Sequence, residues 1–103
     1  MGLWGWLTKS WGWGDHRSRR ADKHRIAQLE RDASSGDARA HRQLGDAYAR
    51  LGRTADAKQQ FETAARLHLK ASHRPRALAM LTKAADLDRN DWRLRAWIGD
   101  LLA

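Results

Sequence analysis

Apolar residues recur at steps of three and four along most of the chain, the spacing that places side chains on one face of an α-helix. The pattern predicts helices over residues of about 18–33, 38–51, 54–71, 75–87 and 92–103. Loops of about two to five residues join these segments, and such short loops make neighbouring helices antiparallel. The sequence therefore predicts an all-α fold of about five helices.

Residue types at the segment ends fit helix boundaries. Ser18 and Asp37 are predicted N-caps, because their side chains can accept a hydrogen bond from the first free backbone N–H groups. Gly52 is expected to end the second helix in the left-handed conformation, with Thr54 beginning the third. Pro75 cannot continue a helix but suits the first turn of the next one.

Each helix is expected to bury one stripe of side chains. Valine is absent and there is a single proline, so the composition also favours helix over strand. The residues expected to face the core are Ala21, Ile26, Leu29 and Ala33; Leu44, Ala47, Tyr48 and Leu51; Ala57, Phe61, Ala64, Ala65 and Leu67 or His68; and Ala77, Leu78, Leu81, Ala84 and Leu87.

Chemistry-bearing residues do not form a catalytic or metal-binding pattern. There is no cysteine, and the five histidines lack the spacing of metal ligands. Most carboxylates stand beside Arg or Lys, as helix-surface pairs do, and no phosphate-binding loop is present. The sequence therefore predicts a non-enzymatic protein with no cofactor and no metal.

The first fourteen residues, MGLWGWLTKSWGWG, form a segment rich in Trp and Gly. They lack the features of a secretory signal, a membrane span or a myristoylation site. Three interpretations stay open: docking on a partner protein, contact with an anionic membrane surface, and folding back on the first helix. The residues predicted to make the contact are Trp4, Trp6, Leu7, Trp11 and Trp13.

The second and third helices carry a more specific spacing, namely Leu44-Gly45, Tyr48, Gly52, Ala57, Phe61 and Ala64. This spacing resembles the tetratricopeptide repeat over residues 38–71. His41 stands where an aromatic residue is usual, and Leu69 where a proline often closes the repeat. The resemblance implies antiparallel helical hairpins stacked as a short solenoid; an unrelated five-helix bundle is the alternative.

Parts of the pattern recur further along, which indicates a partial, compressed repeat over residues 74–103. Arg39, Gly45 and Asp46 correspond to Arg93, Gly99 and Asp100, each 54 positions later, instead of the roughly 34 of a regular array. The third helix is therefore expected to serve two hairpins. In similar sequences a glycine usually occupies the place of Ser72.

The resemblance also implies a concave face for an acidic or amphipathic peptide segment. A solvated face crossed by ion pairs is the alternative. Asp46 would repel a C-terminal carboxylate of the kind that some relatives bind with Lys and Asn. The residues implied for this face are Arg39, Arg42, Asp46, Ala49, Arg50, Arg93 and Asp100.

The last helix carries apolar residues that cannot all reach one preceding hairpin. We expect this end to contact another chain, either a second copy or a partner protein. The residues predicted to make that contact are Trp97, Ile98, Leu101 and Leu102.

Together these features predict three parts: an arm (1–14), a basic helix that packs on the repeats (15–36) and a repeat domain (37–103). The predicted function is a cytoplasmic protein–protein adaptor or assembly subunit. The net charge of +8 also allows a peripheral membrane adaptor. Nucleic-acid binding is disfavoured, because acids are interspersed with the bases and no reading motif is present.

Overall fold

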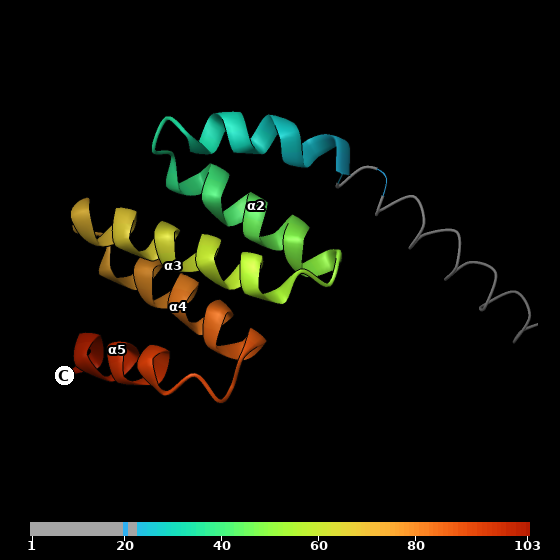
Figure 1. Ribbon diagram of the computed structural model, residues 1–103. Helices are drawn as coiled ribbons and strands as arrows, with labels where there is room; N and C mark the ends of the chain where they lie inside the picture. Colours follow the sequence, from blue (N-terminus) through green and yellow to red (C-terminus); the bar gives the residue numbers. More distant parts are fainter. Residues whose placement is uncertain (1–19, 21–22) are drawn as a thin grey trace, which may run out of the picture.

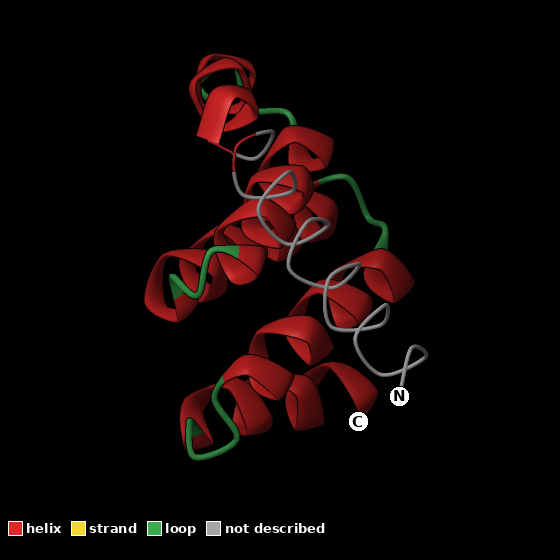
Figure 2. Cartoon of the chain, turned by 90° about the vertical axis from the view of Figure 1, so that its right-hand side faces the viewer, coloured by secondary structure: helices red, strands yellow, loops and turns green. Residues whose placement is uncertain are grey.

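The computed structural model describes residue 20 and residues 23–103 (Figure 1). Residues 23–33 are helical, and four helices follow: α2 (Ala38–Arg50), α3 (Thr54–Lys70), α4 (Arg74–Leu87) and α5 (Trp92–Leu102). The helices lie side by side in chain order and alternate in direction. Only helices and short connections occur in this part of the chain (Figure 2), which confirms the all-α prediction.

The predicted helix boundaries of α2 and α4 are confirmed. Asp37 is the N-cap of α2, and its carboxylate accepts a hydrogen bond of 3.0 Å from the Arg39 N–H. Gly52 follows α2 with φ +78°, the left-handed conformation that costs glycine little. Pro75 lies in the first turn of α4, while the predicted cap Ser18 lies outside the described residues.

The turn after α3 uses the same backbone geometry without a glycine. Ser72 has φ +63°, and its N–H donates to the Leu69 carbonyl at 3.0 Å. The N–H of His73 donates to the His68 carbonyl at 2.8 Å, which completes a Schellman turn. This turn directs the chain straight back along α3, so that α4 begins beside the end of α3.

Small residues allow α2, α3 and α4 to pack closely. Ala47, Ala57, Ala64 and Ala65 have no exposed surface, and neither do Ala77, Leu81 and Ala84 of α4. Ile26, Leu29 and Ala33 belong to the same core, as predicted for the helix before α2. Ala21, predicted on the same stripe, is not among the described residues.

One predicted core position in α4 is wrong. Leu78 is only partly buried, whereas Met80, which was not predicted, is 6% exposed and belongs to the core. The reason is rotation of the helix: the buried set 77, 80, 81 and 84 follows helical steps around Leu81, and Leu78 lies at its edge. Leu87 packs partly buried against the core.

Polar contacts hold the hairpins together at their sides. The Tyr48 hydroxyl donates to Glu30 at 2.9 Å and so joins α2 to the helix before it. Lys58 of α3 lies 3.0 Å from both Asp88 and Asp91, which flank the turn into α5. These contacts fix where α5 starts and how the first helix sits on α2.

Helix α5 is anchored mainly by Leu94, which is 1% exposed. Trp97, Ile98 and Leu101 are partly buried against the core. Trp92 and Leu102 are 72% and 69% exposed. Of the four residues predicted to contact another chain, three therefore pack on their own core, and Leu102 is the most open.

Candidate functional site

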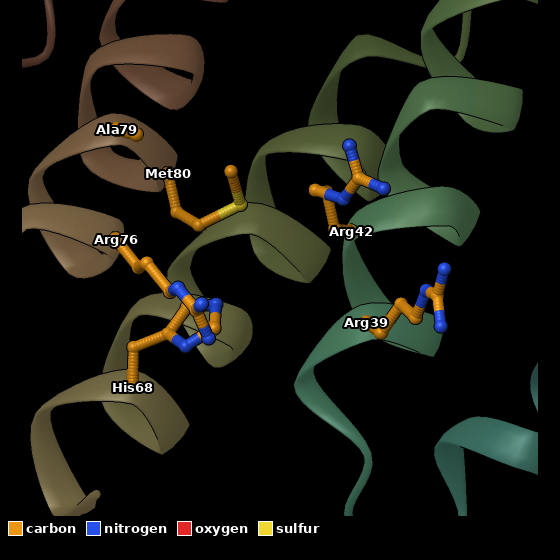
Figure 3. A pocket seen from close by; sticks show the side chains of 6 residues that line it. All are labelled: Arg39, Arg42, His68, Arg76, Ala79 and Met80. Carbon is orange, nitrogen blue, oxygen red and sulfur yellow. The ribbon is translucent and has the colours of Figure 1, made fainter. Parts of the chain in front are cut away.

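A basic pocket of about 490 Å³ lies between α2 and α4, over the end of α3 (Figure 3). Its lining combines guanidinium groups, an imidazole and an apolar surface. The lining residues are Arg39 and Arg42 of α2, His68 of α3, and Arg76, Ala79 and Met80 of α4. Two of them, Arg39 and Arg42, were among the residues implied for the concave face.

The antiparallel order of the helices brings these side chains together. Helices α2 and α4 both run opposite to α3, so their N-terminal turns lie at the end where α3 finishes. Arg39 is the second residue of α2, Arg76 is the third residue of α4, and His68 lies in the last turn of α3. The pocket is therefore built at one end of the helix layer.

The side chains occupy two walls and a floor (Figure 3). His68 and Arg76 lie on one side, and Arg42 and Arg39 belong to α2 on the other, with the guanidinium group of Arg39 turned away from α4 in this view. Met80 extends from α4 toward α2 between them, and it is almost fully buried. A ligand in this pocket would meet cations on both sides and a thioether below.

The electrostatics of the pocket are one-sided. Among the residues that the structure describes, no acidic side chain lines it, and Arg39, Arg42 and Arg76 form no ion pair. Burial lowers the pKa of His68, and the positive charges of Arg76, His73 and Arg42 lower it further. The cluster therefore repels an added proton and would attract an anion.

The helix starts add to this positive field. The first turns of α2 and α4 contain no acidic residue, although acids are favoured there by the helix dipole. Asp37 caps α2, but the N-cap of α4, His73, makes no side-chain capping hydrogen bond. Arg76 thus adds its charge at a helix end that is already positive.

The other α2 residues that were implied for the concave face do not line this pocket. Asp46 forms an ion pair with Lys83 of α4 at 3.0 Å, further along the same two helices. Ala49 is half-buried against the core, and Arg50 is exposed at the end of α2. Asp46 was expected from the sequence to repel a carboxylate ligand. Its charge is instead compensated by Lys83, outside the pocket.

The structure does not bring Arg93 and Asp100 to the pocket, because α5 contributes no lining residue. Arg93 instead lies 3.6 Å from Asp91, the cap of its own helix. Sequence reasoning missed Arg76, Ala79 and Met80 as site residues and placed His68 only as a core candidate. The available signal was that Arg39 and Arg76 each follow a helix start closely.

The other predicted contact residues stay predictions. Trp4, Trp6, Leu7, Trp11 and Trp13 lie outside the described residues. On α5, the ring of Trp97 lies 5.5 Å from the Arg66 guanidinium of α3, a cation–π contact that holds it to its own chain.

Comparison with known families agrees with this geometry. A family profile for the tetratricopeptide repeat matches residues 38–70, which span α2 and α3. The chain contains a tetratricopeptide repeat. The close approach of the repeat's two helices rests on Gly45 and the ring of Phe61. A search of curated proteins found no match to the chain.

The repeat defines a class of site and not an activity. Tetratricopeptide repeats are protein-interaction modules, typically without catalysis, which agrees with the coarse functional prediction. Within residue 20 and residues 23–103, no cluster of three His, Cys, Asp or Glu could hold a metal ion. No helix in that same part of the chain is long and apolar enough to cross a membrane.

Proposed function

We propose that the chain is a non-enzymatic cytoplasmic adaptor that binds an acidic, amphipathic segment of another protein in the pocket between α2 and α4. The single observation that carries this proposal is the set of three arginines around one cavity that, within the described part of the chain, no acidic residue lines. The tetratricopeptide repeat supports it, since the pocket opens on the first helix of the matched repeat.

The lining also supports an amphipathic ligand. A guanidinium group binds a carboxylate through two parallel hydrogen bonds, which favours acidic side chains. Ala79 and the small exposed part of Met80 line the pocket from α4, which favours an apolar side chain next to the acid. A segment that alternates acidic and apolar residues satisfies both requirements.

Binding of defined peptides to the full chain tests this proposal. The probes are fluorescein-labelled peptides of alternating Glu and Leu, and the same peptides with Lys in place of Glu. The Glu peptide should bind, with affinity that falls as salt rises, and the Lys peptide should not bind. Equal binding of the two peptides, or binding of neither, would overturn the proposal.

Two charge-neutralising variants locate the site. Arg42→Gln and Arg76→Gln should each weaken binding of the Glu peptide by about tenfold, as expected for loss of a charged hydrogen bond. Arg93→Gln makes the same change of net charge on α5, outside the pocket, and should leave affinity within about twofold. Equal weakening by all three would point to net charge instead of the pocket.

We propose the Trp-rich arm as a second contact, with membrane-surface binding as its alternative. The observation is the four tryptophans at 4, 6, 11 and 13, followed by a stretch rich in basic residues. The full chain and a variant with Trp4, Trp6 and Trp11 changed to Ser are sedimented with anionic vesicles. Loss of sedimentation in the variant would favour the membrane alternative; equal behaviour would exclude it.

A further inference from the structure

We infer that the anion recognised in the basic pocket is a phosphomonoester, carried as phosphoserine or phosphothreonine on the bound segment. This inference rests on the proposed function, because it names the chemical class of ligand for the same site. It differs from that proposal in excluding a side-chain carboxylate as the preferred anion. Four features of the pocket carry it: its charge, its donor geometry, the imidazole and its volume.

The charge of the pocket matches a dianion. Arg42 and Arg76 stand on opposite sides of the cavity and are permanently charged, which gives two positive charges without counting Arg39. A carboxylate carries one negative charge and would leave one guanidinium uncompensated. A phosphomonoester carries about −1.5 to −2 near neutral pH and would compensate both.

The donor geometry also favours three acceptor oxygens. A carboxylate has two oxygens, and one guanidinium fork uses both of them. A phosphate group has a third terminal oxygen, so that forks from α2 and α4 can bind it together. Since Arg42 and Arg76 come from different helices, a shared ligand also links α2 to α4 at this end.

The imidazole of His68 supplies a third partner that responds to the anion. The charged groups that act on it are Arg76 from α4, His73 in the turn, whose ring centroid lies 6.2 Å away, and Arg42 from α2, while Arg39 of α2 lines the same pocket. Burial, and after it the positive charges of Arg76, His73 and Arg42, hold the pKa of His68 below its ordinary value. A bound dianion would offset that repulsion, so the pKa of His68 should rise on binding.

The volume indicates that the phosphate comes attached to a larger group. About 490 Å³ is far more than one phosphate group fills, and Ala79 and Met80 line the cavity beside the cations. A phosphorylated residue within a peptide would place its phosphate between the guanidinium groups and neighbouring side chains on the apolar floor. A free inorganic phosphate would leave that floor uncovered.

The test compares three peptides that differ at one position. The central residue of an alternating Leu-Gly peptide is Ser, Glu or phosphoserine, and binding to the full chain is measured by fluorescence anisotropy near pH 7. We expect phosphoserine to bind at least about tenfold more tightly than Glu, and Ser not to bind. Equal binding of Glu and phosphoserine would overturn this inference but leave the proposed function standing. Failure of both would overturn both.

Charge-conserving variants test the fork geometry. Arg42→Lys and Arg76→Lys keep the charge but lose the bidentate donors, so each should reduce the preference for phosphoserine over Glu by about tenfold. Arg93→Lys on α5 is the matched control and should keep the full preference. Circular dichroism confirms that each variant is folded. An unchanged preference in both pocket variants would overturn the inference.

The signal of His68 gives a readout that a purely structural role would not produce. Its pKa, measured by NMR on the imidazole Cε1–H, should rise when the phosphoserine peptide is added and stay constant with the Ser peptide. Inorganic phosphate should displace the peptide in competition. A lipid headgroup is the other source of a phosphomonoester. If the chain sediments with phosphatidic acid vesicles, if Arg42→Lys abolishes this sedimentation and if the phosphopeptide does not bind, the site belongs to lipid and the inference is overturned.

Discussion

Gly45 on α2 lies so close to Phe61 on α3 that a Cβ atom at position 45 would stand 2.7 Å from the Cε1 atom of the ring. The ring is buried, since Phe61 is only 2% exposed, so it has little room to withdraw. This contact sets how closely the two helices of the tetratricopeptide repeat approach each other. It also explains why the repeat combines a glycine on one helix with a large aromatic residue on the other.

Gly45→Ala should destabilise the protein by about 1–3 kcal/mol, because the added methyl group forces the ring or the helix to shift. Urea unfolding followed by circular dichroism measures the change. Gly99→Ala is the matched control: its Cβ would meet nothing within 4 Å, and α5 should gain up to about 1 kcal/mol from the better helix former. Equal effects of the two substitutions would contradict the packing argument.

Tyr48→Phe should destabilise the protein by about 0.5–1.5 kcal/mol, because it removes the hydrogen bond to Glu30 and leaves the ring in place. The pKa of the Tyr48 hydroxyl is raised, mainly by burial and then by Glu30. A raised pKa means that the folded state holds the proton longer, so stability falls as the pH rises above 10.0. The Tyr48→Phe variant should lack this alkaline loss, which unfolding curves measured on both sides of that pH would reveal.

The helices could be predicted from the sequence because their signals are local. Asp37, Gly52 and Pro75 fix helix ends by backbone and capping chemistry, which needs no knowledge of the rest of the fold. The position of Met80 depends instead on how α4 rotates against its neighbours. From the spacing alone, Leu78 was predicted to be the buried residue. In the structure, the packing of α4 against its neighbours buries Met80 instead.

The candidate site could be predicted only in part for the same reason. Arg39 and Arg42 lie on the first helix of the repeat, so the resemblance alone indicated them. Their meeting with Arg76 and His68 depends on the register of α4 and the end of α3 against α2. The correspondence of Gly45 with Gly99 suggested that α5 repeats the role of α2, but Gly99 has open space around it and Gly45 does not.

Ser72→Gly should stabilise the protein by up to about 1 kcal/mol, because Ser72 holds a left-handed backbone that glycine adopts without steric cost. Thermal unfolding would show a higher midpoint. Ser72→Ala keeps the steric penalty and loses the hydroxyl, so it should be no more stable than the native protein. A more stable Ala variant would mean that the conformation at this turn is not strained.

Lys58→Met should make the protein less sensitive to acid, since Lys58 is the main cause of the lowered pKa of Asp91. A lowered carboxylate pKa contributes stability above the ordinary value of 3.8 and loses it as the pH falls through the lower folded value. The native protein should therefore exceed the variant in stability at neutral pH, with the difference shrinking below 3.8. Lys70→Met, at the exposed end of α3, is the control and should leave the acid profile unchanged.

His68 should cost the protein stability in mild acid. Its pKa in the folded state lies below 6.5, so the unfolded state binds a proton first as the pH falls. The protein therefore loses stability as the pH falls from 6.5 to the lower pKa that His68 has in the folded state. His68→Gln should flatten this part of the stability profile, which urea unfolding at a series of pH values would show.

The neighbours of His68 allow the cause of its lowered pKa to be separated. Arg76→Gln and Arg42→Gln each remove one positive charge, so each should raise the pKa of His68, with the larger rise for Arg76. Burial is the first cause and stays in both variants, so the pKa should remain below its ordinary value. Imidazole NMR titration measures the shift. An unchanged pKa in both variants would mean that these guanidinium groups do not share one pocket with the imidazole, and the basis for anion binding there would be lost.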